Sequence, residues 1–343
     1  MYQIALSLSD GASKSCLSTI DGVDIEGELV FTTAYPGYSQ SITDPSYHGQ
    51  ILVFAFPCIG IYGLDQVDFQ SSKPWVKGVV VQRLQDTEGT LEKWLAEWGV
   101  PIITGLDCRS LVLKLREIDT PMARISKTGE PPVVDTLGVG LVSDVSSSAV
   151  RNYGSGSLSV ALIDYGTKMD IVRRLVDRGC SVTLLPHSAA PRLVLDGDFD
   201  GVLLSNGPGD PSLLSEEIGV VRELLGKIPI LGICLGCQIL ALACGAETVR
   251  LPYGHRGGNH PVLDLRAGRA MVTSQNHGYA IDESSLKDTD LDISFRHLSD
   301  GTVEGISDPT LRISGVQFHP EAGAGPLDGL WIFDDFVDTL RRT

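Results

Sequence analysis

The stretch PILGICLGCQILALACGA, residues 229–246, carries the clearest signal of the fold and of the candidate site. A short apolar run enters a Gly-x-Cys-x-Gly turn and continues with helical periodicity. Gly232 and Gly236 lack side chains, so the chain can turn sharply from strand to helix and lift Cys234 clear of the sheet. The N–H groups that begin the helix favour the thiolate form of such a cysteine. Although most buried cysteines are inert packing groups, this pattern predicts a nucleophilic thiol at Cys234.

The segments around this elbow alternate between two patterns. Helical periodicity covers residues 168–178, 212–226 and 235–244, and apolar strand-like runs lie between these segments. Alternating strands and helices are typical of a parallel sheet, so we predict an α/β domain with a mostly parallel sheet and the cysteine elbow at one sheet edge. Further strands, partly antiparallel, are expected beyond residue 270, and a final helix is expected over about 327–341.

A Ser- and Gly-rich stretch without an apolar period, residues 143–159, is predicted to connect two domains. The chain has 343 residues, which is enough for roughly two domains of about 150 residues each. Residues 1–150 contain short strand-like runs and two helical runs, and we predict a separate N-terminal α/β domain there. The second domain is expected over residues 159–343.

The overall charge of the chain excludes several classes of partner. Lys and Arg number 27 against 43 Asp and Glu, which gives a net charge of −16. Such a surface repels phosphate backbones and anionic lipids, so neither nucleic acid nor a membrane is an expected partner. No apolar run reaches about 18 residues, and the start of the chain does not follow the pattern of a secretory signal. Because the seven cysteines are not spaced as a disulfide framework, we expect a cytoplasmic protein with reduced thiols.

A cysteine nucleophile needs a proton shuttle, a group that orients the shuttle, and donors for the developing oxyanion. His319 follows the apolar run RISGVQF, and Glu321 stands two residues later, on the same side of an extended chain. Ligands of open α/β sheets gather at the carboxyl ends of the strands, where Cys234 is also expected. The turn SNGPGDP, residues 205–211, has glycines that let backbone N–H groups approach a bound group, which suits an oxyanion hole. A plain Pro-Gly-Asp turn is the alternative interpretation of this string.

The strings GICLGCQ, SNGPGDP, QNHGYA and GVQFHPEA, in this order and spacing, resemble the motifs of class I (triad) glutamine amidotransferases. This resemblance implies that Cys234 is the nucleophile, that His319 acts first as base and then as acid, and that Glu321 orients His319. Ammonia would leave L-glutamine through a thioester. The stretches GELVFTTAYPGYSQSITDPSYHGQ, PCIGIYG, IDYGTK, LVDRGC and GHRGGNHPV extend the resemblance over nearly the whole chain, to the small subunits of carbamoyl-phosphate synthase.

The same resemblance implies a set of contacts to L-glutamine. The backbone N–H groups of Gly207 and Leu235 would form the oxyanion hole. Gln238 lies one helical turn beyond Cys234 and can reach its ligand, whereas only the resemblance places Ser46 near the site. The implied contacts are Ser46, Gly207, Gly209, Leu235, Gln238, Asn276, Gly278 and Tyr279.

In the family that the chain resembles, the small subunit docks onto a large synthetase subunit, which receives ammonia through a tunnel. The large subunit uses ATP, Mg and bicarbonate, so the resemblance implies no cofactor in this chain. The absence of a dinucleotide fingerprint and of a Walker A string agrees with this expectation. The implied assembly is a heterodimer, alone or as several heterodimers together, that supplies arginine and pyrimidine synthesis.

Two places depart from the family pattern. Cys237 stands where the family usually has His, and the loop YPGYSQ, residues 35–40, stands where it usually has MTGYQE, a change expected to alter contacts near Ser46. Cys237 also forms a Cys-x-x-Cys string with Cys234 at a helix start, which makes a thiol–disulfide redox protein a rival hypothesis. A glutaminase subunit of another amidotransferase and a catalytically silent scaffold are the further alternatives.

The histidines of the chain raise the question of a metal site. His255 and His260 lie in the Gly-rich string GHRGGNHPV, without carboxylates beside them. We therefore expect structural roles for both residues and predict no metal ligand. His277 is expected to belong to a loop on the substrate side of the site.

Overall fold

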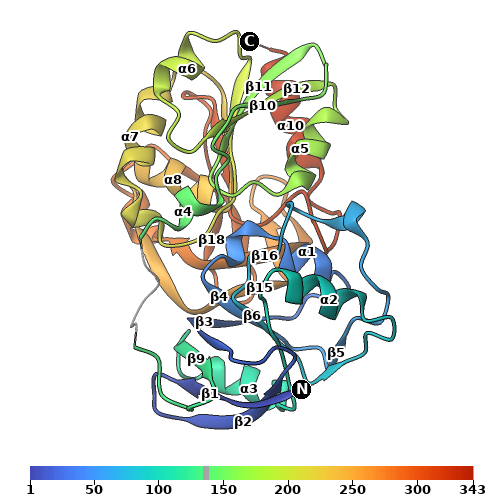
Figure 1. Cartoon of the computed structure of the whole chain (residues 1–343). Coiled ribbons are helices and arrows are strands. Elements are labelled where there is room, and N and C mark those ends of the chain that lie inside the picture. The colour runs from blue at the N-terminus through green and yellow to red at the C-terminus, as the bar shows by residue number, and fades with distance from the viewer. Residues whose placement is uncertain (134–138, 343) are drawn as a thin grey trace.

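The computed structural model describes residues 1–133 and 139–342. In Figure 1 the first part of the chain, in blue and blue-green, lies below a larger part that runs from green to red. A seven-stranded closed barrel forms the lower part, and a ten-stranded sheet with helices on both faces forms the upper part. Among the described residues, no helix is both long and apolar enough to cross a lipid bilayer.

The N-terminal barrel has the strand order β1-β2-β8-β6-β4-β3-β9. Its strands alternate between two apolar clusters, as the two-residue period of a strand requires: Ile51 and Val53 of β4 join one cluster, and Leu52 and Phe54 join the other. The first cluster also contains the apolar face of α3, and the second contains those of α1 and α2. The elements of this part are β1 (Tyr2–Leu8), β2 (Ser13–Ser18), β3 (Asp24–Thr32), α1 (Tyr38–Ile42), η1 (Pro45–Tyr47), β4 (Gln50–Phe54), β5 (Cys58–Ile59), η2 (Gln66–Asp68), β6 (Gly78–Val80), β7 (Arg83–Leu84), α2 (Thr90–Glu97), β8 (Ile102–Thr104), α3 (Cys108–Leu115) and β9 (Met122–Ser126).

The C-terminal sheet has the strand order β10-β12-β11-β13-β14-β19-β18-β16-β15-β17. Its five central strands, from β12 to β19, are parallel, and antiparallel strands extend the sheet on both sides. The α/β class and the parallel arrangement around the elbow agree with the prediction from the alternating pattern. The strands are β10 (Arg151–Tyr153), β11 (Leu158–Asp164), β12 (Cys180–Pro186), β13 (Gly201–Leu204), β14 (Ile230–Ile233), β15 (Thr248–Asp264), β16 (Arg269–Ile281), β17 (Asp292–His297), β18 (Val303–Asp308) and β19 (Ile313–Val316).

Two apolar clusters hold helices against opposite faces of this sheet. One contains the inner faces of α7 and α8, and the other contains those of α5 and α10 (Figure 1). Alternate residues of β11 supply both clusters, because Ile163 belongs to the first and Leu162 to the second. The helical elements are α4 (Leu141–Val145), α5 (Met169–Val176), α6 (Pro191–Leu195), η3 (Pro211–Leu213), α7 (Ser215–Leu224), α8 (Leu235–Ala243), α9 (Glu283–Leu286) and α10 (Trp331–Leu340).

The connection between the two parts differs from the expectation drawn from composition. Arg151–Tyr153, inside the Ser- and Gly-rich stretch, form strand β10, which pairs antiparallel with β12. The stretch is therefore not wholly a linker, because its end already belongs to the second sheet. A short polar strand at a sheet edge needs little apolar periodicity, and this explains why the pattern did not reveal it.

Candidate active site

The cysteine elbow lies at the carboxyl end of β14, where α8 begins. Cys234 has φ 54° and ψ −107°, a conformation that a residue with a side chain rarely adopts, and its side chain is buried. A Cβ at position 232 would lie 2.6 Å from the carbonyl oxygen of Gly236, and a Cβ at position 236 would lie 2.6 Å from the carbonyl carbon of Leu204. Both flanking glycines are thus required by the close approach of strand and helix.

A chain of three charged groups lies beside the elbow. Nδ1 of His319 and Oε1 of Glu321 are 2.7 Å apart, and Nζ of Lys168 is 2.8 Å from the same carboxylate oxygen. All three side chains are almost fully buried. β19 ends at Val316, so His319 lies past the strand rather than at its last residue, and a single bridge to Ser274 of β16 holds it there. The sequence motifs did not indicate Lys168, the last residue of IDYGTK, as part of the site. The one feature that could have indicated it is its position just after an apolar strand.

The charges of this chain shift the pKa values of its members. Burial alone lowers the pKa of His319, but the interactions with the Glu321 carboxylate and with Cys234 together outweigh burial, and the pKa rises to about 10. Burial alone raises the pKa of Glu321, but Lys168 and His319 together lower it to about 2. The pKa of Lys168 is raised, because Glu321 and Asp44 outweigh the effect of its burial. At neutral pH the three groups are therefore an imidazolium, a carboxylate and an ammonium.

Because Nδ1 of His319 contacts Glu321, Nε2 is the ring nitrogen that remains to exchange a proton with Cys234. Nε2 of His319 is buried and has no hydrogen-bond partner within the described part of the chain. The charge of Cys234 also contributes to the raised pKa of His319. The Cys234 sulfur is also 3.6 Å from the carbonyl oxygen of Asn276 and 3.7 Å from Nε2 of Gln317. The structure thus brings the three predicted catalytic side chains together.

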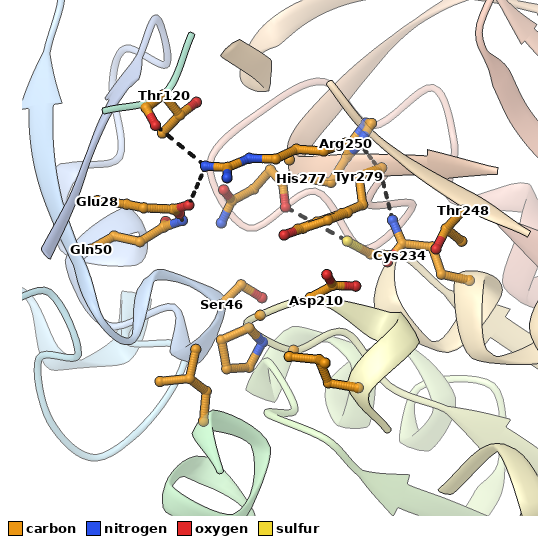
Figure 2. Close-up of a pocket in the computed structure, with 18 of the residues that line it drawn as sticks. Glu28, Ser46, Gln50, Thr120, Asp210, Cys234, Thr248, Arg250, His277 and Tyr279 are labelled. Atoms are coloured by element: carbon orange, nitrogen blue, oxygen red, sulfur yellow. Dashed lines mark hydrogen bonds and ion pairs between the residues drawn. The ribbon is translucent and has the colours of Figure 1, made fainter. Parts of the chain in front are cut away.

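A cavity of about 400 Å³ opens beside Cys234, between the two parts of the molecule. Figure 2 shows Ser46, Glu28 and Gln50 on the N-terminal side of this cavity and Cys234 with Tyr279 on the other side. The side chain of Leu235, the eighth expected contact, instead belongs to the core under α8. Seven of the eight expected glutamine contacts line the cavity: Ser46, Gly207, Gly209, Gln238, Asn276, Gly278 and Tyr279.

Hydrogen bonds across the domain boundary place Ser46, which sequence reasoning could not position. The Asp44 carboxylate accepts a hydrogen bond from the Ser46 N–H at 2.9 Å and caps the short helix η1. Nδ2 of Asn206 donates to Oγ of Ser46 at 2.8 Å, and Nδ2 of Asn276 donates to Asp44 at 3.1 Å. One asparagine from the loop after β13 and one from β16 therefore hold the Ser46 turn against the cavity.

Charged residues that the motifs did not reveal close the far end of the cavity. Arg250 of β15 makes a 2.7 Å ion pair with Glu28 of β3, and Gln50 donates to the same carboxylate at 2.9 Å (Figure 2). Inside the cavity wall, Nε2 of Gln238 donates to the carbonyl oxygen of Tyr279 at 2.7 Å and to Gln317 at 3.0 Å. The amide of Gln238 thus holds the wall that carries the predicted substrate contacts.

The two positions that depart from the family pattern lie away from the cavity beside Cys234. Cys237 is completely buried in the cluster under α7 and α8, whereas Cys234 packs with the cluster on the opposite face of the sheet. Burial raises the pKa of Cys237 well above its usual value, so this thiol is a poor attacking group. Gln40 lines a second cavity, together with Tyr35 and Gly37.

Comparison with known proteins agrees with this geometry. The glutamine amidotransferase class-I family model matches residues 161–339, the part that contains the elbow and the His319–Glu321 pair. The model of the carbamoyl-phosphate synthase small chain, CPSase domain, matches residues 6–125. Fold and site together thus define a class-I glutamine amidotransferase domain behind a second, family-specific domain.

Curated relatives cover almost all of the chain. The carbamoyl phosphate synthase arginine-specific small chain of Bacillus subtilis is 41% identical over 342 residues, which are 98% of this chain and 96% of the relative. The carbamoyl phosphate synthase small chain of Fusobacterium nucleatum is 40% identical over 99% of each chain, and that of Methanopyrus kandleri is 40% identical over 98% of this chain and 99% of the relative. The chain belongs to the carbamoyl phosphate synthase small chain family.

Proposed function

We propose that this protein hydrolyses L-glutamine to glutamate and ammonia, with Cys234 as nucleophile, His319 as proton shuttle and Glu321 as the group that orients the shuttle. The observation that carries the proposal is the buried His319–Glu321 pair, 2.7 Å apart, beside a cysteine that opens on a cavity between the two domains. Family membership supports the same reaction class.

The charge state of the site supports a definite order of proton transfers. The Cys234 thiolate, beside the already protonated His319, attacks the amide carbon of glutamine, and the N–H groups of Gly207 and Leu235 stabilise the oxyanion. The raised pKa of His319 keeps a proton on its ring at neutral pH, and this proton goes to the departing nitrogen, which leaves as ammonia. The imidazole, now neutral, takes a proton from water, and the resulting hydroxide attacks the thioester. Glutamate leaves, and the Cys234 thiolate and the protonated His319 are regenerated.

The ammonia is proposed to pass to a large synthetase subunit, which makes carbamoyl phosphate from it with ATP and bicarbonate for arginine and pyrimidine synthesis. ATP and Mg would bind to that subunit and not to this chain. The working assembly is proposed to be a heterodimer in the cytoplasm, and the arginine-specific name of the Bacillus subtilis relative supports the link to arginine.

A glutaminase assay on the full-length chain, with and without a large subunit, tests the proposal. Cys234→Ala is expected to abolish ammonia release, and Cys237→Ala, the matched control on the same helix, is expected to retain most of it. A Cys237→Ala chain as inactive as Cys234→Ala would contradict the triad and favour a role for both thiols. The buried position of Cys237 is the observation against the redox alternative.

A further inference from the structure

Three neighbouring strands bring buried histidines and a carboxylate together behind the cavity wall. His255 of β15 and His277 of β16 stand directly opposite each other across the antiparallel pair, and Glu304 comes from β18. The exposed fractions of these residues are 5%, 5% and 0%. The sequence string around His255 showed no carboxylate, because Glu304 is distant along the chain and only the sheet brings it near.

The three side chains aim polar atoms at one another. Nδ1 of His255 lies 3.5 Å from Oε1 of Glu304, and Nε2 of His277 lies 3.8 Å from the same oxygen. The ligand atoms of this trio all lie within 4.8 Å of one another. None of these three buried atoms has a hydrogen-bond partner in residues 1–133 and 139–342. Buried polar atoms without partners are rare in native proteins and call for a ligand.

The spacing and donor types fit a transition-metal ion. Zinc binds imidazole nitrogen and carboxylate oxygen at about 2.0–2.2 Å, which places the donors of a tetrahedral site about 3.3–3.4 Å apart. The two distances from the imidazole nitrogens to Glu304, 3.5 and 3.8 Å, therefore need a contraction of only a few tenths of an ångström, and all three donor atoms lie within 4.8 Å of one another. Two imidazoles exclude magnesium and calcium, which prefer oxygen donors.

Each of the three side chains is oriented through its other polar atom, as metal ligands are. Nε2 of His255 is 2.7 Å from the Asp300 carboxylate, and Nδ1 of His277 is 2.7 Å from the carbonyl oxygen of Tyr279. Nε2 of Gln275 donates to Oε2 of Glu304 at 2.7 Å. Each of the three side chains thus has a hydrogen-bond partner on one side. The atoms that face one another, Nδ1 of His255, Nε2 of His277 and Oε1 of Glu304, have none among the described residues.

We propose that His255, His277 and Glu304 bind one Zn²⁺ ion, with a fourth position for water. A second trio, His255 with His260 and His297, is less suited, because Nδ1 of His260 and Nε2 of His297 already hydrogen bond each other at 3.1 Å. The rival explanation of the cluster is a proton shared between His255 and Glu304 without any metal. A divalent ion would also offset the charge of the fully buried Glu304 carboxylate.

The ion would act on the wall of the glutamine cavity. His277 lines that cavity between Asn276 and Gly278, and Figure 2 shows it beside Arg250 and Tyr279. A bond from His277 to an ion held by β15 and β18 would fix the position of this segment. The site is structural in this proposal and takes no part in the chemical step at Cys234.

Metal analysis of the full-length chain, purified without a histidine tag, tests the proposal. We expect about one zinc per chain by mass spectrometry of the digested protein. After the metal has been removed with a chelator, titration with CoCl2 should give the visible absorption of four-coordinate cobalt, which ZnCl2 should then displace. A chain that holds no zinc and gives no cobalt absorption would overturn the proposal in favour of the shared proton.

Variants separate this site from adventitious binding. Glu304→Gln keeps the side-chain shape and should weaken zinc binding more than about 100-fold, and Asp300→Asn, at a half-exposed position that does not threaten folding, should weaken it about 10–100-fold. His187→Asn, which alters a histidine paired with Glu217 elsewhere, and Cys234→Ser should both bind zinc like the wild type. Zinc binding that survives Glu304→Gln and Asp300→Asn, or that is lost in Cys234→Ser, would refute the assignment.

Discussion

A Gly→Ala substitution should destabilise the protein at one position and stabilise it at another, although the two glycines lie in neighbouring helices. Gly236 is the second residue of α8, and Gly219 lies inside α7. An alanine Cβ at position 236 would lie 2.6 Å from the carbonyl carbon of Leu204 and 2.7 Å from its Cβ, and would also press on its carbonyl oxygen. A Cβ at position 219 would meet no atom within 4 Å.

The distances give the size of the effect. To bring the 2.6 Å approach to an ordinary contact of 3.4 Å, α8 must move by at least about 0.8 Å from a strand in the middle of the sheet, because the carbonyl oxygen lies closer still. Overpacking of this kind costs about 1–3 kcal/mol, and each kcal/mol lowers the melting temperature of a domain of this size by roughly 2–4 °C. A displacement near 1 Å at the nucleophile can also reduce the rate on the order of 10²-fold. Gly219→Ala should instead stabilise α7 by about 0.5–1 kcal/mol, because alanine favours the helix.

Thermal unfolding followed by circular dichroism, together with kcat/KM for glutamine, measures both effects. We expect Gly236→Ala to melt several degrees lower and to lose most of its glutaminase activity, while Gly219→Ala melts slightly higher and keeps its activity. Equal melting temperatures for the two variants, or a fully active Gly236→Ala chain, would refute the argument that close packing of α8 on β13 positions Cys234.

Three further predictions concern the buried polar network. Lys168→Met should cost about 1.5–3 kcal/mol in the free energy of unfolding, because the buried Glu321 carboxylate loses one of its two charged partners; a loss below about 1 kcal/mol by denaturant titration would contradict this. Asn206→Ala removes the hydrogen bond to Ser46 and should raise KM for glutamine about tenfold with little change in kcat, as steady-state kinetics would show. The pKa of His319 is raised from 6.5 to about 10 on folding, so its stabilisation is complete below pH 6.5 and is lost as the pH rises toward 10. The free energy of unfolding of the wild type should therefore exceed that of His319→Asn by less and less as the pH rises across this range. A difference that grows with pH would show that folding lowers the pKa of His319 and would contradict the argument.

Local sequence was sufficient for the elements that carry the nucleophile. Helices predicted over residues 168–178, 212–226 and 235–244 are α5 (Met169–Val176), α7 (Ser215–Leu224) and α8 (Leu235–Ala243). Their apolar periodicity is strong because each helix buries one face against the sheet. The short polar strand β10 has no such periodicity, and for that reason composition indicated only a linker.

The elbow follows from local sequence alone, because a glycine on each side of Cys234, an apolar strand before it and a helix after it all act within a few residues. The surroundings of the sulfur and of the cavity depend instead on how the whole chain packs. The contacts of Lys168 with Glu321, of Asn206 with Ser46, and of His255 with Glu304 join residues from different strands and loops. Such contacts depend on sheet order and on the packing of two domains, which no local pattern encodes, and they set the charges and shape that the chemistry requires.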